Sequence, residues 1–322
     1  MQEEGPRRNE GTPLDLEWIR GVGIDEGEVE RSAEDRDAPG RYDRPGDTDR
    51  RPRHAGPGGD EPARLLRVVS CIDLTTLSGD DTPARVQRLC AEARDPLPST
   101  LRADLGTPTS SPTVAAVCVF HEMVETALKA LEGSGIPVAA VSAGFPHGLS
   151  PLPSRLTEIR ASVSAGAREI DAVIPRFLAL EGRWEELYDT VSAYRDACRG
   201  AHLKIILSTG ELGSLATVLN ASLVSMMAGA DFIKTSTGKE RVNASFPAGL
   251  VMARAIREYG RHTGYVVGLK PAGGIRKAHE ALKWLALAME ELGEAWTGPT
   301  LFRIGASSLL ADVVRELERV AR

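Results

Sequence analysis

The fold is decided by the stretch LKIILSTG (203–210), LATVLNASLVSMMAGA (215–230) and DFIKTSTG (231–238). A short apolar run ends in Ser, Thr and Gly, a longer run with helical spacing follows, and a second short apolar run comes next. Short apolar runs bounded by glycine and separated by a helix are typical of parallel strands joined by a crossover helix. This stretch therefore predicts one strand–helix–strand unit.

The same unit recurs on both sides of that stretch. Strands are expected at 65–74, 115–120, 138–146, 169–176, 203–210, 231–238, 265–274 and 301–308. Helices are expected at 82–93, 121–133, 155–166, 184–198, 215–230, 247–260, 278–292 and 309–321. Eight such units predict an α/β fold of the (β/α)8 TIM-barrel type rather than a doubly wound sheet. No G-x-G-x-x-G opens the first unit, which disfavours a dinucleotide-binding site.

Residues 1–62 differ from the rest of the chain in composition. Residues 1–60 hold 16 acids and 10 bases, whereas residues 61–322 hold 29 of each. The N-terminal segment is rich in Gly, Pro, Asp and Arg, so we expect 1–62 to be a disordered extension and 63–322 to be the barrel. A barrel with no net charge lacks the excess of basic residues that is typical of nucleic-acid-binding proteins.

The remaining composition narrows the class of protein further. The 322 residues contain no apolar stretch of membrane-spanning length, and the charged N-terminus lacks the apolar core of a secretion signal. The four cysteines form no C-x-x-C pair, so a cytoplasmic location is expected. The six histidines have no ligand spacing, and we therefore expect no metal.

Two lysines stand out because the chain prefers arginine for its positive charges. Only 7 of the 39 basic residues are lysines, yet Lys204, Lys234 and Lys270 fall inside predicted strands. Lys234 and Lys270 come near the C-terminal ends of adjacent strands, where barrel enzymes carry their chemistry. Burial and a neighbouring ammonium should lower the pKa of a lysine and supply the neutral amine that attacks a carbonyl. A single strand lysine would be interpreted as an ion-pair partner, but two on neighbouring strand ends predict chemistry.

Two acids accompany these lysines. Asp171 lies inside the strand EIDAVIPR, and Asp73 lies near the end of SCIDLTTL. A buried carboxylate needs a cation, so the acids and lysines could balance each other and relay protons. For Asp73, a helix-capping or turn role is an equally good interpretation.

The loops after the last three strands share another pattern. They read TSTGK (235–239), PAGGIR (271–276) and GASS (305–308). Glycine allows close backbone approach, Ser and Thr donate hydrogen bonds, and a helix N-terminus follows the last loop. Barrels frequently bind phosphate at this place, so the three loops together predict a phosphate site.

Seven motifs taken together resemble the deoxyribose-phosphate aldolase family over residues 66–320. They are CIDLTTL (71–77), GFPHG (144–148), EIDAVIP (169–175), TGEL (209–212), ADFIKTSTGK (230–239), GLKPAGGIR (268–276) and FRIGASSLL (302–310). The resemblance implies a class I aldolase that reversibly cleaves 2-deoxy-D-ribose 5-phosphate to D-glyceraldehyde 3-phosphate and acetaldehyde, in deoxyribose phosphate catabolism, without a cofactor. Chains of that family usually begin just before the first strand, so residues 1–60 would be an addition.

The resemblance also implies a role for each matching residue. Lys234 would form the Schiff base, and Asp171 and Lys270 would relay protons. Asp73 and Thr75 match a polar pair near the sugar hydroxyls. The phosphate would be held by the three glycine-rich loops, through Gly238, Lys239, Gly273, Gly274, Ser307 and Ser308.

Two alternatives remain open at the level of the sequence. One is a class I aldolase or transaldolase-like enzyme acting on another sugar phosphate, which a panel of substrates would separate. The other is a non-catalytic barrel that binds a sugar phosphate; the presence of Lys234, Asp171 and Lys270 counts against it. The expected partner is a small-molecule sugar phosphate, with neither nucleic acid nor membrane, and a homodimer is the oligomer we allow for.

Overall fold

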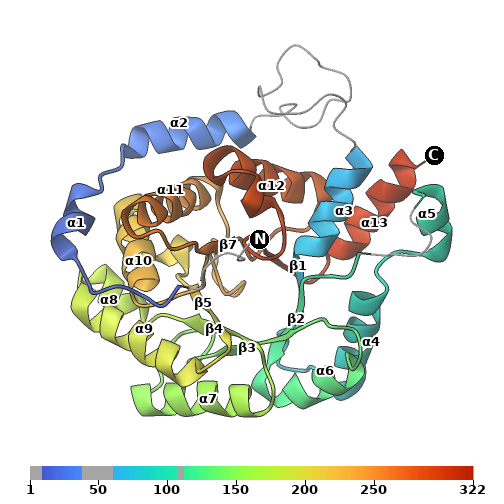
Figure 1. Ribbon diagram of the computed structural model, residues 1–322, viewed down its shortest axis with the longest axis horizontal. Coiled ribbons are helices and arrows are strands. Elements are labelled where there is room, and N and C mark those ends of the chain that lie inside the picture. The colour runs from blue at the N-terminus through green and yellow to red at the C-terminus, as the bar shows by residue number, and fades with distance from the viewer. Residues whose placement is uncertain (1–8, 38–60, 107–111, 322) are drawn as a thin grey trace, which may run out of the picture.

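The computed structural model describes residues 9–37, 61–106 and 112–321, and it contains one eight-stranded parallel sheet surrounded by helices (Figure 1). The strands are β1 (Ile72–Thr75), β2 (Ala116–Phe120), β3 (Val138–Ser142), β4 (Glu169–Val173), β5 (His202–Ile206), β6 (Phe232–Lys234), β7 (Gly268–Lys270) and β8 (Ile304–Ala306). The helices are α1 (Leu16–Gly21), α2 (Glu26–Asp37), α3 (Glu61–Cys71), α4 (Pro83–Arg94), α5 (Ser99–Asp104), α6 (Val124–Ala130), α7 (Leu152–Ser164), α8 (Arg176–Leu180), α9 (Trp184–Cys198), α10 (Leu215–Met227), α11 (Phe246–Thr263), α12 (Ala278–Leu292) and α13 (Leu309–Val320). Three short 3-10 helices are η1 (His121–Met123), η2 (Thr209–Glu211) and η3 (Glu294–Thr297).

The sheet curls into a barrel. Its strand order is β7-β6-β5-β4-β3-β2-β1-β8, and every named pair is parallel. Two isolated bridges, Leu269 to Phe302 and Ala272 to Gly305, then connect β7 to the β8 side. The predicted (β/α)8 barrel is confirmed. Because all strands run the same way, their C-terminal ends meet at one rim.

Alternation along each strand separates the apolar shell from the barrel interior. On β4, Ile170 and Ala172 belong to the apolar core that packs under the helices, whereas Glu169 and Asp171 belong to a buried polar network. Successive side chains of a strand point to opposite faces. The charged residues of β4 therefore face the interior, which is where the functional side chains lie.

The first predicted strand is only partly correct. We expected a strand over 65–74, but α3 occupies Glu61–Cys71 and β1 has only four residues. Leu65, Val68 and Val69 are buried, and their spacing of three and four residues is that of one helix face. The β-branched residues of 65–74 favour a strand, and they led us to overlook this helical spacing. Asp73 consequently sits in the second position of a short strand and not near its end.

The prediction of a disordered extension is wrong for residues 9–37. The structure places α1 and α2 there, on the outer side of α10, α11 and α12 (Figure 1). Asn9 is 1% exposed, and its amide nitrogen donates to the carbonyl oxygens of Met226 at 2.7 Å and Ala230 at 2.9 Å. The Tyr259 hydroxyl donates to the Asn9 side-chain oxygen at 3.0 Å. The predictions for residues 1–8 and 38–60 lie outside the described residues.

Ion pairs and one aromatic stack attach the part of the N-terminal segment after Asn9 to helices α11 and α12. Trp18 stacks on His262 with ring centroids 4.2 Å apart. Glu28 accepts from Arg254 at 2.5 and 2.8 Å, and Arg36 donates to glutamates of α12. The partners of these residues are supplied by distant helices. Composition alone therefore underestimated what this polar segment could bind to.

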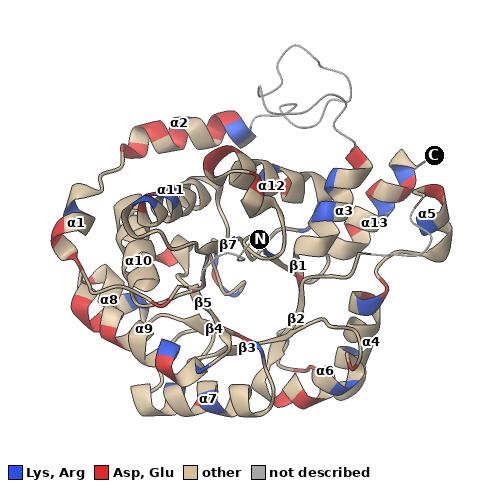
Figure 2. Ribbon diagram, in the orientation of Figure 1, with Lys and Arg blue, Asp and Glu red and all other residues tan. Residues whose placement is uncertain are grey.

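The outer surface carries both signs of charge. Figure 2 shows acidic and basic residues on helices all around the barrel. Over the described ranges, no helix is both long enough and apolar enough to cross a membrane. All four cysteines are buried, and none of them forms a disulfide.

Candidate active site

Two lysines occupy corresponding positions at the rim. Lys234 is the last residue of β6, Lys270 is the last residue of β7, and the two are direct partners in the strand register. Lys204 lies in the middle of β5, opposite Asp171 of β4. The structure therefore brings together the lysines and the acid that the sequence singled out.

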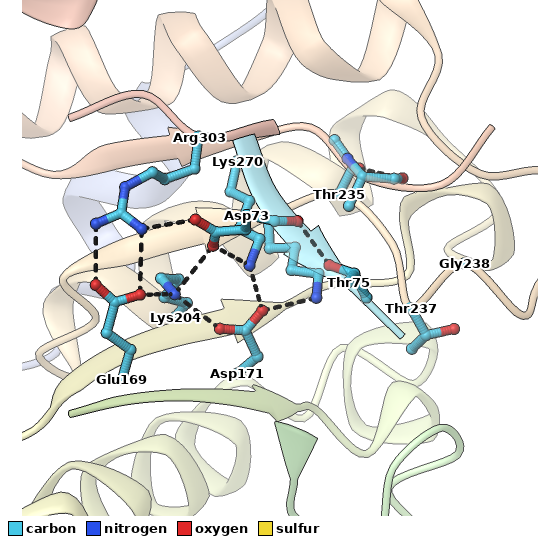
Figure 3. A network of polar contacts seen from close by, with 12 residues as sticks. Asp73, Thr75, Glu169, Asp171, Lys204, Thr235, Thr237, Gly238, Lys270 and Arg303 are labelled. Atoms are coloured by element: carbon cyan, nitrogen blue, oxygen red, sulfur yellow. Dashed lines mark hydrogen bonds and ion pairs between the residues drawn. The ribbon is translucent and has the colours of Figure 1, made fainter. Parts of the chain in front are cut away.

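Asp171 is the residue that contacts all three lysines at the C-terminal end of the barrel (Figure 3). One carboxylate oxygen, Oδ2, accepts from Lys234 Nζ at 2.7 Å and from Lys270 Nζ at 2.6 Å. The other oxygen accepts from Lys204 Nζ at 3.1 Å. One carboxylate thus links all three lysines, which is the arrangement a proton relay requires.

Asp73 holds Lys270 from the opposite side. Its Oδ2 accepts from Lys270 at 2.5 Å and from Lys204 at 3.2 Å, and its Oδ1 accepts from Arg303 at 2.6 Å. Asp73 is fully buried, and both of its oxygens are taken by cations. The capping or turn interpretation is wrong. The arrangement favours a positioning role for Asp73 over direct contact with a sugar hydroxyl.

Two residues that sequence analysis did not single out complete the network. Glu169 accepts from Lys204 at 2.5 Å and from Arg303 at 2.9 and 3.2 Å. Both Glu169 and Arg303 are less than a tenth exposed. The sequence does contain a pattern that indicates Glu169. It lies two positions before Asp171, so the two side chains share one face of the strand. Arg303 precedes β8 and gave no such pattern.

The buried carboxylates are ionised. Burial alone would raise the pKa values of Asp73, Glu169 and Asp171, but the surrounding cations outweigh it and lower all three. Burial likewise acts to lower the pKa of Lys270, and the carboxylates of Asp171 and Asp73 reverse it, so the net direction is upward. The expectation of a lowered lysine pKa is therefore wrong for Lys270, which stays protonated. For Lys234 it stays a prediction.

Charge counting separates Lys234 from the other cations. The three carboxylates of the network are balanced by Lys204, Lys270 and Arg303. Lys234 is a fourth cation, and it pairs with the same Asp171 oxygen that Lys270 uses. Loss of its proton leaves every buried carboxylate of the network paired. Among these four basic residues, Lys234 is thus the one whose neutral form costs the network least.

One glycine makes room for this arrangement. A Cβ at Gly305 would lie 2.8 Å from the Ala272 Cβ and 3.3 Å from the Lys270 Cε. The GASS segment therefore also serves the lysine network, because its glycine lets the Lys270 side chain pass.

The opposite wall of the interior is apolar. Cys118 of β2 and Ala139 and Val141 of β3 form a buried cluster separate from the main core. Burial raises the pKa of the Cys118 thiol, so it remains protonated. The reacting end of the barrel thus has a charged side and an apolar side.

The three glycine-rich loops lie next to each other, as their strands do. Gly238 faces the Gly273 turn, since a Cβ at Gly238 would lie 3.9 Å from the Gly273 Cα. Gly238, Gly273 and Gly274 have φ of +84°, +86° and +86°, a region that favours glycine. Ser307 and Ser308 are exposed at the start of α13.

The structure shows the exposure and contacts of two further predicted site residues. Lys239 is exposed in the same loop as Gly238. Thr75 ends β1 partly buried, and its hydroxyl donates to the Asp73 carbonyl oxygen at 2.7 Å. Within the described ranges, no group of three His, Cys, Asp or Glu residues is arranged to hold a metal ion.

Comparison with known proteins assigns the chain to a family. The model of the DeoC/LacD family aldolases matches residues 67–314. The deoxyribose-phosphate aldolase of Mus musculus is 53% identical over 309 residues, covering 95% of this chain and 93% of the relative. That of Homo sapiens is 50% identical and covers 96% of this chain and 93% of its own length. The chain belongs to the DeoC/LacD aldolase family.

The comparisons also correct one expectation about this DeoC/LacD aldolase. An alignment over 95% of the chain has to extend into residues 1–60. With respect to the mammalian relatives, the N-terminal segment is therefore no addition. A solved deoxyribose phosphate aldolase from Aeropyrum pernix has the same fold, with a TM-score of 0.60 and 24% identity over 82% of this chain and 99% of that one.

Proposed function

We propose that this protein is a deoxyribose-phosphate aldolase that cleaves 2-deoxy-D-ribose 5-phosphate to D-glyceraldehyde 3-phosphate and acetaldehyde. The proposal rests on the family and on the names of its mammalian relatives. The observation that carries it is the charge balance around Asp171, which leaves Lys234 as the cation in excess. A lysine amine that can be neutral is what a Schiff-base aldolase requires.

The reaction begins at Lys234 in this proposal. Its neutral amine adds to the aldehyde carbon of the open-chain sugar, and loss of water gives an iminium ion. The bond between C2 and C3 then breaks as the C3 hydroxyl loses its proton, and the electron pair moves into an enamine. Protonation of that enamine and hydrolysis release acetaldehyde and regenerate the amine.

Asp171 and Lys270 move the protons. Lys270 stays protonated, and its ammonium and Lys234 share the Asp171 Oδ2 atom at 2.6 and 2.7 Å. A proton leaving one nitrogen therefore has a carboxylate oxygen within hydrogen-bond reach. Water activated by this pair is the proposed base for the C3 hydroxyl. Asp73, Lys204, Glu169 and Arg303 are the groups proposed to hold this pair in position.

The phosphate end of the substrate is proposed to lie over the loops after β6, β7 and β8. The supporting observations are the adjacency of Gly238 and Gly273 and the exposure of Ser307 and Ser308 at the start of α13. Backbone amides at a helix N-terminus favour an anion. Thr75 lies at the rim beside the network and is the proposed partner of a sugar hydroxyl.

Borohydride trapping tests the chemistry directly. Purified protein is treated with acetaldehyde and sodium borohydride, and the modified peptide is mapped by mass spectrometry. We expect one adduct, on Lys234, and we expect Lys234→Arg to abolish both trapping and cleavage because a guanidinium stays protonated. Lys129→Arg is the matched control, since it makes the same change in an exposed lysine of α6, away from the proposed site.

The possible results separate the alternatives. Turnover by Lys234→Arg, or an adduct on another lysine, would reject the assignment of the nucleophile. Trapping without release of acetaldehyde from deoxyribose 5-phosphate would point to an aldolase for another sugar phosphate. Four buried cysteines without a disulfide support the proposal of a cytoplasmic location. A homodimer is our expectation for the oligomer, to be measured by analytical ultracentrifugation.

A further inference from the structure

The loop after β6 holds an anion of its own. The carboxylate of Glu240 accepts from the backbone N–H of Thr237 at 3.0 and 3.1 Å, of Gly238 at 3.1 Å and of Lys239 at 3.2 Å. Three successive amides thus converge on one carboxylate. Figure 3 shows Thr237 and Gly238 beside the charged network rather than within it.

Such a set of amides is a general receptor for anions. Successive N–H groups that point to one side of the chain form a concave site that suits phosphate as well as carboxylate. This site adjoins the Gly273 turn, because a Cβ at Gly238 would lie 3.9 Å from the Gly273 Cα. Gly238, one of the three amide donors, therefore lies beside a loop that is proposed to bind phosphate.

Glu240 is held on a second side by Ser208. Arg176 donates to the Ser208 hydroxyl oxygen at 3.2 Å, which leaves the Ser208 proton to donate to Glu240. Partial burial acts to raise the pKa of Glu240, but the Thr237 amide and the Ser208 and Thr237 side chains outweigh it, so its pKa is lowered. The group is a carboxylate at neutral pH, with the same sign of charge as a phosphate.

The backbone at this position is fixed independently of the carboxylate. Asn243 donates from its side-chain nitrogen to the Glu240 carbonyl oxygen at 2.9 Å. The Glu240 side chain is partly exposed and can rotate away while its main chain stays in place. The amides of Thr237 and Gly238 would then be available to another anion, together with that of Lys239, which also donates to the Thr237 hydroxyl oxygen at 3.1 Å.

We propose that Glu240 is a specificity-determining residue whose carboxylate competes with the substrate phosphate for the amides of Thr237, Gly238 and Lys239. This inference rests on the proposed function, because it concerns the phosphate end of the same substrate. A phosphate that uses these amides has to displace the carboxylate. Glu240 thereby weakens binding of phosphorylated sugars relative to sugars without a phosphate.

The test compares two substrates in four proteins. The ratio of kcat/KM for 2-deoxyribose 5-phosphate to that for 2-deoxyribose is measured in wild type, Glu240→Ala and Glu240→Gln. Glu185→Gln is the control, because it removes one exposed carboxylate from α9, in another part of the barrel. The dissociation constant of inorganic phosphate is measured on each protein by calorimetry, and melting temperatures establish that each is folded.

We expect Glu240→Ala to raise the ratio about tenfold, equivalent to about 1.4 kcal/mol, and to tighten phosphate binding by a similar factor. Glu240→Gln should change both in the same direction by less, because its amide oxygen still accepts from the loop. Glu185→Gln should leave both as in wild type.

An unchanged or lowered ratio in a folded Glu240 variant would overturn the proposal. If Glu240 only stabilised the structure of the loop, its replacement would weaken phosphate binding. If Glu240→Ala does not fold, the ratio measured for Glu240→Gln decides between these outcomes. Wild-type protein that cleaves neither sugar would reject the proposed function instead. The calorimetry would then still decide whether Glu240 competes with phosphate.

Discussion

Replacing Lys204 by methionine tests the charge balance that singles out Lys234. Lys204 is fully buried and donates to Glu169 at 2.5 Å, Asp171 at 3.1 Å and Asp73 at 3.2 Å. Without it, three carboxylates face Lys270 and Arg303 alone. The network regains neutrality only when Lys234 holds its proton. The variant should therefore keep its fold and lose the neutral amine.

The size of the effect follows from the contacts with Asp171. Unit charges 4 Å apart interact by about 4 kcal/mol at an effective dielectric constant of about 20. Lys204 and Lys234 contact different oxygens of Asp171, so their mutual repulsion is smaller, about 1.5–3 kcal/mol. A free-energy difference of this size corresponds to a factor of about ten to a hundred. At neutral pH, trapping should slow by about ten- to a hundredfold.

The assay is the rate of borohydride trapping with acetaldehyde between about pH 6 and pH 10. We expect the deficit of Lys204→Met relative to wild type to be largest at neutral pH and to shrink as the pH rises, because the missing positive charge favours the ammonium form of its neighbour. Lys129→Met, an exposed change of the same kind on α6, should keep the wild-type profile. A wild-type rate at neutral pH in folded Lys204→Met would refute the charge argument, and an equal loss of rate at every pH would indicate a structural role instead.

Two further predictions follow from other contacts. Asn9→Ala should lower the free energy of unfolding by about 2–4 kcal/mol, because it leaves the Met226 and Ala230 carbonyls and the Tyr259 hydroxyl without their buried partner. Urea denaturation measures this free energy. A change below about 0.5 kcal/mol would show that the residues near Asn9 do not pack on the barrel in solution. Stability should also fall as the pH drops below about 5, because the buried carboxylates of β1 and β4 have lowered pKa values and the unfolded chain takes up protons first. Denaturation curves at several pH values would contradict this if stability stayed level down to about pH 3.

The eight-unit barrel could be predicted because each strand and helix carries its own period. Lys234, Lys270 and Asp171 could be selected because a charged residue is conspicuous in an apolar strand. The same reasoning failed at α3, where a β-branched composition concealed the helical spacing of Leu65, Val68 and Val69. Local pattern is informative only where period and composition agree.

The parts of the site that could not be predicted depend on partners far away in the chain. Arg303 became part of the network through Asp73 and Glu169, which precede it by 230 and 134 residues. Asn9 is buried because α10 and α11 offer it carbonyl and hydroxyl groups. No short pattern contains such information. The direction of the Lys270 pKa likewise depended on how many carboxylates surround it, which only the packed barrel reveals.

The division between strands and loops has a consequence for how such an enzyme can be altered. The lysines and carboxylates of the network lie on or directly beside the strands, whereas the amides that Glu240 occupies lie in a loop. Strand positions are fixed by register on both sides, and loops accept substitution and insertion far more readily. Under the proposed function, new acceptor aldehydes can therefore be sought by varying residues 237–243 and 273–276 while Lys234 is left unchanged. In an engineering campaign, this separates the choice of substrate from the bond-breaking step.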